Sequence, residues 1–166
     1  MRRTPFFKVH CLAVLLACGL LVSTAAAQST IFIVRHAEKA QNSGDDPDLS
    51  EAGRARAESL ANLLKDASIS AIYTSELKRT QQTAAPIAKI LHLEPTVIAA
   101  KDRAALLAKL KDSSGNVLVV GHSNTIPDLI EALGVATPIS IADNDYDNLF
   151  VVVLEEKPRL IRLHFR

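Results

Sequence analysis

Short segments rich in apolar residues recur along the chain, and polar residues directly follow the segments at 31–34 and 149–154. The segments at 31–34 and 116–120 are rich in β-branched residues, and neither alternates with polar positions. That pattern is typical of strands buried on both faces of a parallel sheet. The last two segments flank a Glu-Lys-Pro turn and predict a closing hairpin. In total the segments predict six strands, at residues 31–34, 69–73, 96–98, 116–120, 149–154 and 159–164.

Between the strands, apolar residues recur at the spacing of helices that bury one face. Ser50 and Ser75 are suitable N-caps for two of these helices, and Pro127 falls in the first turn of a third. Strands that alternate with helices predict an α/β fold, a three-layer α/β/α sandwich with a mixed, mostly parallel central sheet. The expected helices span about 50–66, 75–91 and 102–110, and a fourth begins at Ser123 or Asn124.

The first 27 residues have the pattern of a secretory signal peptide. Three basic residues precede an apolar stretch at 11–22, and Ala25-Ala26-Ala27 offers a cleavage site. We therefore expect residues 1–27 to be removed, and residues 28–166 to form one exported domain, periplasmic or secreted, with no stable membrane insertion. Two alternatives are an uncleaved membrane anchor and a lipoprotein modified at Cys18.

Charge and cysteine content narrow the class of protein further. The signal segment holds three basic residues and no acidic one, which leaves 16 basic against 18 acidic residues in 28–166. No basic field therefore recruits nucleic acid. Both cysteines, Cys11 and Cys18, lie in the signal segment, so we expect no disulfide in the exported domain.

Histidines and arginines follow the ends of three predicted strands. Arg35 and His36 come directly after the first strand, Arg79 lies just past the second, and His122 follows the fourth. Ligands of open α/β sheets bind at the carboxyl ends of the strands. Arginine binds phosphate oxygens in pairs and keeps its charge, and a neutral imidazole is a competent nucleophile. The combination favours phosphoryl chemistry, with the pKa of His36 lowered by nearby arginines.

Four ordered segments resemble the motifs of the histidine phosphatase superfamily, which includes the phosphoglycerate mutases. Residues 35–38 resemble its Arg-His-Gly signature, with alanine in place of the glycine, and Asn42 stands where the family often has a phosphate-loop asparagine. Residues 49–57, 75–84 and 120–124 resemble its helix-start, second-arginine and second-histidine motifs. The resemblance covers most of the chain from 31 to about 125 and implies the same α/β sandwich.

The resemblance also implies a two-step hydrolysis of a phosphate ester. His36 would attack phosphorus and become a phosphohistidine, which water then hydrolyses. No cofactor is implied, and no group of histidines and carboxylates has metal-ligand spacing. The groups that would bind the phosphoryl oxygens are Arg35, Asn42, Arg79, His122 and Ser123.

The acid that would protonate the leaving group is less clear from the sequence. One branch of the family has an aspartate directly after its second histidine, but Ser123 stands there in this chain. Glu38 is the nearest candidate proton donor, and Asp143, Asp145 and Asp147 are others. An acid matters less where the leaving group departs easily, as in phosphohistidine on a protein. We therefore expect the partner to be a phosphorylated small molecule or a phosphoprotein.

Two other functions stay open. The segment Gly121-His122-Ser123 is similar to the Gly-x-Ser-x-Gly nucleophile turn of serine hydrolases, although Thr125 stands where that turn needs its last glycine. The domain could instead bind a phosphorylated envelope component without turning it over.

Overall fold

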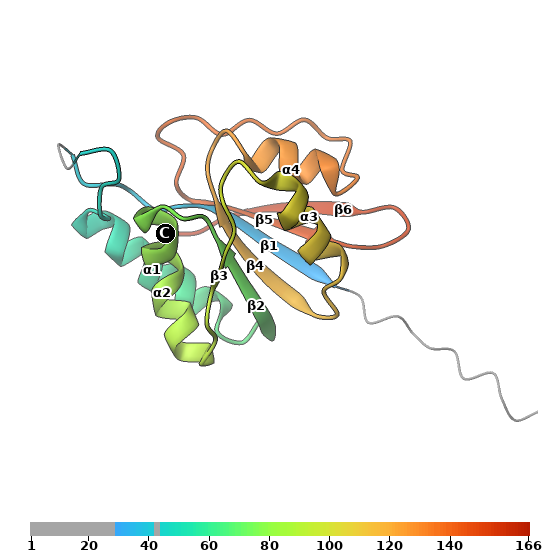
Figure 1. Cartoon of the computed structure of the whole chain (residues 1–166), viewed down its shortest axis with the longest axis horizontal. Helices are drawn as coiled ribbons and strands as arrows, with labels where there is room; N and C mark the ends of the chain where they lie inside the picture. Colours follow the sequence, from blue (N-terminus) through green and yellow to red (C-terminus); the bar gives the residue numbers. More distant parts are fainter. Residues whose placement is uncertain (1–28, 42–43) are drawn as a thin grey trace, which may run out of the picture.

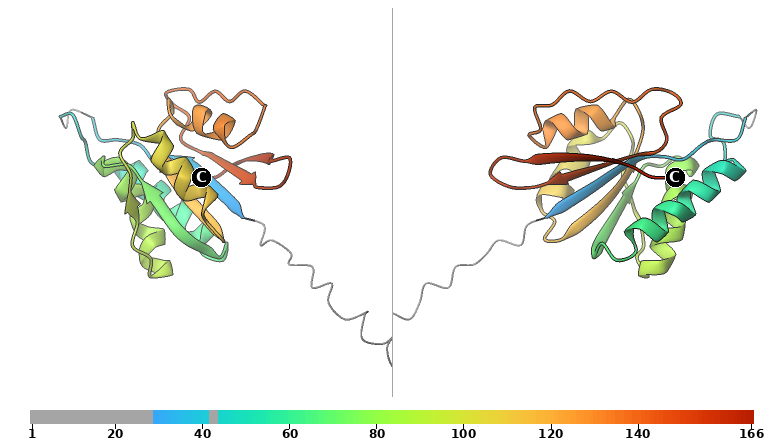
Figure 2. Two further views of the ribbon diagram at one scale, coloured as in Figure 1. Left: turned by 45° about the vertical axis from the view of Figure 1, so that its right-hand side comes forward. Right: turned by 180° about the vertical axis from the view of Figure 1, so that it is seen from behind.

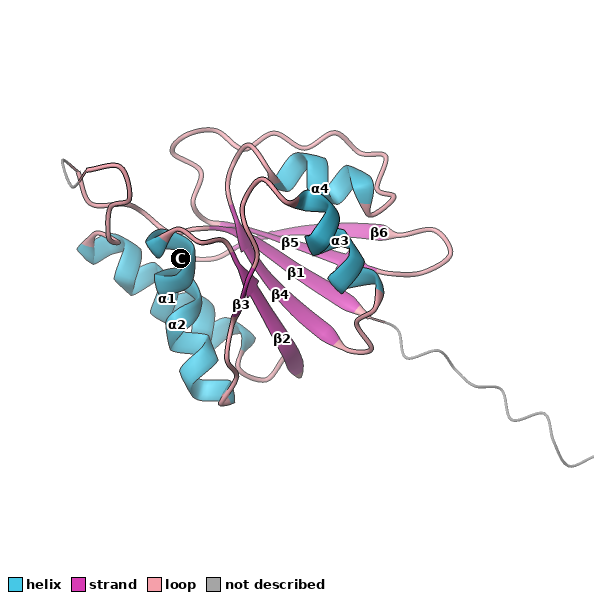
Figure 3. Ribbon diagram, in the orientation of Figure 1, coloured by secondary structure: helices cyan, strands magenta, loops and turns pink. Residues whose placement is uncertain are grey.

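The computed structural model describes residues 29–41 and 44–166, which are organised around one six-stranded sheet (Figures 1 and 3). The order of strands in the sheet is β3-β2-β4-β1-β5-β6. The neighbouring pairs among β1 to β4 are parallel, and β5 and β6 pair antiparallel. The mixed, mostly parallel sheet expected from the sequence is thus confirmed. The strands are β1 (Thr30–Arg35), β2 (Ile69–Thr74), β3 (Thr96–Val97), β4 (Asn116–Gly121), β5 (Asn148–Val153) and β6 (Arg159–His164).

Two helices cover each face of the sheet, which makes the predicted three-layer sandwich (Figure 2). Successive side chains of β1 alternate between the two cores, as a strand buried on both faces requires. Val34 packs with α1 and α2, whereas Ile31 and Ile33 pack with the core under α3 and α4. The helices are α1 (Glu51–Leu64), α2 (Lys78–Leu91), α3 (Arg103–Lys111) and α4 (Ile126–Ala132).

The pairing of β1 with β4 places two strand ends side by side. Arg35 is level with Gly121 in the parallel register, and the amide of His36 donates to the carbonyl of Gly121 at 2.9 Å. The residue that follows each strand is therefore a histidine at the same edge of the sheet. This backbone register brings His36 and His122 together before any side-chain contact is considered.

The first helix begins as predicted, and two other helices do not. The Ser50 hydroxyl accepts from the Gly53 amide at 3.0 Å and caps α1. Ser75 does not cap α2, because the helix begins only at Lys78. The cap of α4 is Thr125 rather than Ser123 or Asn124. Both differences come from an extra turn of backbone between the strand end and the helix.

Gly53 lets α1 lie directly against the segment that follows β1. A Cβ atom at this position would be 2.2 Å from the backbone oxygen of Glu38, closer than any side chain allows. The same oxygen accepts the amide of Ser50 at 2.9 Å. The N-terminus of α1 is therefore attached to the backbone two residues beyond His36.

Some expectations concern residues outside the described part of the chain. They are the signal segment 1–27, the lipoprotein alternative at Cys18 and the phosphate-loop role of Asn42. Within the described residues, no helix is both long and apolar enough to cross a membrane.

Candidate active site

A cleft of about 510 Å³ lies over the carboxyl ends of β1 and β4, and we refer to it as the histidine cleft. The rings of His36 and His122 lie in it with their centroids 5.4 Å apart and their planes tilted by 60°. Arg35 and Arg79 also line the cleft, so the structure brings together the four residues that the sequence singled out. The remaining lining residues are Lys39, Leu77, Ala100, Lys101, Ser123, Asn124, Thr125 and Asp143.

The ring of His36 is held by its own neighbour in the chain. Nδ1 lies 2.8 Å from the carbonyl oxygen of Ala37. A carbonyl can only accept, so Nδ1 carries the proton and Nε2 keeps its lone pair. Burial lowers the pKa of His36 to about 4, and the charges of His122, Arg79 and Arg35 act in the same direction. His36 is therefore neutral at physiological pH, with Nε2 able to act as a nucleophile.

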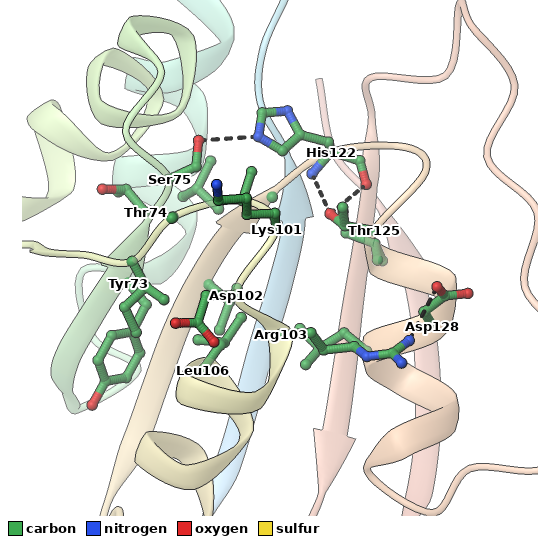
Figure 4. Close-up of a pocket in the computed structure, with 18 of the residues that line it drawn as sticks. Tyr73, Thr74, Ser75, Lys101, Asp102, Arg103, Leu106, His122, Thr125 and Asp128 are labelled. Atoms are coloured by element: carbon green, nitrogen blue, oxygen red, sulfur yellow. Dashed lines mark hydrogen bonds and ion pairs between the residues drawn. The ribbon is translucent and has the colours of Figure 1, made fainter.

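The ring of His122 is held by Ser75, at the end of β2. Nε2 of His122 lies 3.0 Å from the Ser75 hydroxyl (Figure 4). That hydroxyl in turn lies 2.9 Å from the hydroxyl of Thr80. Burial lowers the pKa of His122 to about 4; Arg79 and Arg35 also lower it, and Glu76 raises it. Two neutral imidazoles thus lie next to each other among cations.

The guanidinium of Arg35 is fixed by the loop that precedes β5. Its Nη1 donates to the carbonyls of Ala142 and Asp143 at 2.9 and 3.0 Å. The guanidinium carbon lies 4.2 Å from the centre of the Tyr146 ring, a stacking distance. Its Nε is buried and has no hydrogen-bond partner among the described residues. Arg35 is therefore held rigidly and still has a donor to offer.

Arg79 lies at the second position of α2 and lines the cleft. Its Nη1 is 3.8 Å from Asp46, and its Nε is also buried without a partner in the described part of the chain. Unpaired buried donors cost free energy unless a ligand satisfies them. The unpaired Nε groups of Arg35 and Arg79, with the lysines of the cleft, make the site suited to an anion.

The contacts of Glu38 do not favour the predicted role of proton donor. Glu38 forms a bidentate pair with Arg56, with contacts of 2.7 to 2.9 Å, and does not line the histidine cleft. Burial raises the pKa of Glu38, but the hydrogen bonds and charge of Arg56 outweigh it, so the pKa lies below its usual value. The carboxylate of Glu38 is ionised, and both of its oxygens are bonded to Arg56. Sequence reasoning did not identify Arg56 as the partner of Glu38.

Only one of the three loop acids borders the cleft. Asp143 lines it, whereas Asp145 accepts the amide of Ala142 within its own loop. Asp147 pairs with His164 at 3.2 Å, and this hydrogen bond lowers the pKa of Asp147. Because Asp143 lines the cleft, it is the remaining candidate for the acid that protonates the leaving group.

Ser123 lines the cleft, but the hydroxyl that bonds the ring of His122 belongs to Ser75. A serine nucleophile needs the histidine within hydrogen-bond reach of its own oxygen. The arrangement therefore does not favour the serine hydrolase hypothesis for Ser123.

Sequence reasoning missed Tyr146, Ser75 and Lys101 as parts of the site. Tyr146 is far from Arg35 in the chain, and no spacing pattern links the two. Ser75 was singled out, but as a helix cap. Among the described residues, no group of three or more histidine, cysteine, aspartate or glutamate side chains could hold a metal ion.

The sequence and the fold of this chain resemble those of known proteins. The sequence profile of the histidine phosphatase superfamily (branch 1) matches residues 31–101. The crystal structure of a candidate phosphohistidine phosphatase, SixA of Agrobacterium tumefaciens, is 26% identical, with a TM-score of 0.63 over 81% of this chain and 97% of that one. This chain thus resembles the histidine phosphatase superfamily in sequence over residues 31–101 and in its fold.

Two further members show how far the similarity extends. The protein histidine phosphatase SixA, solved with tungstate, superposes with a TM-score of 0.67 at 20% identity, over 81% of this chain and 96% of that one. Phosphoserine phosphatase 1 of Hydrogenobacter thermophilus is 43% identical over 70 residues, 39% of this chain. That match spans about a third, 33%, of the length of this curated relative. The fold of this chain thus matches nearly the whole length of the two solved SixA structures.

Proposed function

We propose that this domain is a phosphatase that hydrolyses phosphate monoesters through a phosphohistidine on His36. The observation that carries the proposal is the hydrogen bond from Nδ1 of His36 to the Ala37 carbonyl at 2.8 Å. It leaves Nε2 as the unprotonated nitrogen of a ring that lies among cations. The names of the relatives, which include phosphoserine and protein histidine phosphatases, support the same activity.

The reaction has two displacements at phosphorus. In the first, Nε2 of His36 forms a bond to phosphorus while the bond to the leaving atom breaks, and the electron pair goes with the leaving group. In the second, water attacks phosphorus, the phosphorus–nitrogen bond breaks, and the pair returns to Nε2. Water loses a proton to solvent or to the departing phosphate. The products are the dephosphorylated leaving group, orthophosphate and neutral His36.

Arg35, Arg79 and His122 stabilise the charge on the nonbridging oxygens as it develops. A neutral His122 can donate to a phosphoryl oxygen only from Nδ1. The Ser75 hydroxyl must then donate to Nε2, and the 3.0 Å contact suits that role. Ser123 is an auxiliary donor in this scheme, and so is Asn42.

The leaving group takes its proton from Asp143 or leaves without one. The 2.7 to 2.9 Å pair with Arg56 removes Glu38 from this role. A phosphorylated imidazole on a protein departs readily, so phosphohistidine is one substrate that fits the site. A small phosphorylated molecule with a stable leaving group fits equally.

The test compares hydrolysis of p-nitrophenyl phosphate by the wild type and by His36→Ala, with His164→Ala as the control outside the cleft. We expect His36→Ala to lose turnover by at least about 10³-fold, and His164→Ala to keep it. Brief reaction with labelled substrate should leave acid-labile phosphate on His36. Binding of phosphate without turnover by the wild type would instead identify a phosphate-binding protein, and labelling of Ser123 by a fluorophosphonate would identify a serine hydrolase.

We also propose that the domain works outside the cytoplasm after removal of residues 1–27. The basic start and the apolar stretch at 11–22 support export. N-terminal sequencing of the protein recovered from the periplasm should begin at about Gln28. Recovery of the intact chain from the membrane fraction would contradict cleavage, and a lipid attached to Cys18 would identify a lipoprotein.

A further inference from the structure

A second cavity, of about 540 Å³, lies beside the histidine cleft, between α3, α4 and the ends of β2 and β4 (Figure 4). We refer to it as the α3–α4 cavity. The two hollows share Ala100, Lys101, Asn124 and Thr125, and His122 lines both. A molecule held by its phosphoryl group beside His36 can therefore extend past His122 into this cavity.

The α3–α4 cavity has an apolar part, where it borders the core, and about half of its lining residues are polar or charged. The apolar part includes side chains of the core under α3 and α4, namely Ile98, Leu106, Val119, Ile126 and Leu129. An apolar cavity of about 150 Å³ already accepts benzene, so a ring with substituents fits within the volume available here. The apolar part of the wall suits an apolar ring.

The carboxylates around the cavity are already engaged. Asp102 caps α3 by accepting the amide of Ala105 at 3.0 Å. Asp128 pairs with Arg103 at 3.1 Å, at the end away from His122 and Ser75 in Figure 4. A leaving group that lies in this cavity thus has no neighbouring acid ready to protonate it. Phenols, with a pKa of about 10, leave as phenolates without such help more readily than alkoxides do. A phosphorylated imidazole leaves as neutral imidazole once its other ring nitrogen has taken a proton from solvent.

The cavity is formed before any ligand binds. Its wall at 98–102 is attached to β2 and the following turn, because the Ile98 amide donates to the Thr74 carbonyl at 2.9 Å. The Ala100 amide donates to the Glu76 carboxylate at 2.8 Å. A preformed wall lowers the ordering cost of binding.

We propose that the α3–α4 cavity binds the leaving group of the substrate, and that this group is an aromatic ring, either a phenol or an imidazole. The inference rests on the proposed function, since it places the phosphoryl group in the histidine cleft. The apolar part of the wall and the engaged carboxylates support it independently. The two sources of such a ring are an aryl phosphate and a phosphorylated histidine.

The test fills the cavity from an exposed position on α3. Ala104 lines the cavity and is exposed, so Ala104→Phe adds a ring there without disturbing the core. Ala108→Phe is the matched control, because Ala108 is also exposed on α3 but does not line the cavity. Leu106→Asn is a second variant, which changes the polarity of a half-buried wall residue.

The first readout is binding of phenylphosphonate and methylphosphonate, which carry the phosphoryl group but cannot be hydrolysed. We expect the wild type and Ala108→Phe to bind phenylphosphonate at least about tenfold more tightly than methylphosphonate. That is a difference of about 1.4 kcal/mol in binding free energy. Ala104→Phe and Leu106→Asn should erase that preference and leave vanadate binding unchanged. Equal binding of the two phosphonates by the wild type would overturn the inference.

The second readout is kcat/KM for phenyl phosphate, phosphohistidine and acetyl phosphate. Ala104→Phe should lower the first two by about tenfold or more relative to acetyl phosphate, which brings no ring. The larger of the two wild-type values identifies the source of the ring. An equal loss for all three substrates would overturn the inference. A ring preference in binding without hydrolysis of any substrate would overturn the proposed function and the leaving-group role, and would leave the cavity only as a binding site for a ring.

Discussion

Burial sets the protonation of the two active-site histidines. It lowers the pKa of His36 and of His122 to about 4, whereas an exposed imidazole titrates near 6.5. Neighbouring arginines act in the same direction and also provide donors for an anion. The same groups that would bind phosphate in the proposed reaction therefore keep Nε2 of His36 unprotonated.

These lowered pKa values predict that the free energy of unfolding decreases as the pH is lowered. Between pH 6.5 and about 4 the unfolded chain binds protons at His36 and His122 that the folded chain does not. The free energy of unfolding therefore decreases as the pH falls through this window, by up to about 3 kcal/mol for each histidine. Urea unfolding at pH 7, 5.5 and 4 measures the slope. His36→Gln and His122→Gln should each flatten it, and an unchanged slope in both would contradict the pKa values.

Ser75 is predicted to position His122 through its hydroxyl. Ser75→Ala should lower kcat for p-nitrophenyl phosphate by about tenfold, since the neutral ring loses the partner that keeps the proton on Nδ1. Its effect should be much smaller in a His122→Ala background, because the two groups act through one contact. Additive losses in this double-mutant cycle would show that Ser75 acts elsewhere. Ser75→Thr, which keeps the hydroxyl, should recover part of the rate.

Glu38 is predicted to stabilise the fold and to take no part in proton transfer. Glu38→Gln should keep kcat within about twofold and lower the free energy of unfolding by about 1 kcal/mol, because a half-buried pair with Arg56 is weakened. Kinetics and urea denaturation on the same preparation measure both quantities. Asp143→Asn is the comparison, and a larger loss of kcat for Glu38→Gln than for Asp143→Asn would restore Glu38 as the acid.

At the scale of elements, the ends of strands and helices fix where the site residues lie. The loop before β5 holds Arg35 through its carbonyls, and α2 carries Arg79 near its N-terminus. The amide of Ala37 donates to the Thr83 hydroxyl on α2 at 2.9 Å, which ties that helix to the end of β1. The site therefore depends on how α1 and α2 pack against β1.

The contact between α1 and the segment after β1 gives a prediction for Gly53. Gly53→Ala should lower the free energy of unfolding by about 1–3 kcal/mol, because a Cβ there would lie 2.2 Å from the Glu38 backbone oxygen. This loss exceeds the gain of up to about 1 kcal/mol that alanine brings to a helix. Thermal and urea unfolding test it, with Ala52→Ser, at the exposed neighbouring position, as the control. A stabilised Gly53→Ala would mean that α1 can move away without cost.

At the scale of the whole molecule, an anion should bind to the folded state alone, because its ligands come from β1, α2 and β4. Vanadate at a hundred times its Kd should stabilise the wild type by about 2.7 kcal/mol, which thermal unfolding detects as a raised Tm. Arg35→Gln and Arg79→Gln should lose most of that rise, and His164→Ala should keep it. Equal stabilisation of all four proteins would place the anion outside the histidine cleft.

The alternation of apolar strands with amphipathic helices was enough to predict the three-layer sandwich. Strands that are buried on both faces need helices on each side of the sheet. Local motifs were enough to locate Arg35, His36, Arg79 and His122, since a parallel sheet brings strand ends to one edge. The pairing of Glu38 with Arg56 could not be predicted in this way. Both residues lie in familiar motifs, but which of their neighbours they face depends on how α1 packs.

The order of residues is enough to predict the layers of this protein and the side chains at the ends of its strands, because short-range periodicity carries that information. The hydrogen bond between Ser75 and His122, the stacking of Tyr146 on Arg35 and the pairing of Glu38 with Arg56 become visible only in the folded chain. The same is true of the cavity between α3 and α4. These features join residues far apart in the chain, and the free energy that selects them comes from packing, which no local pattern records.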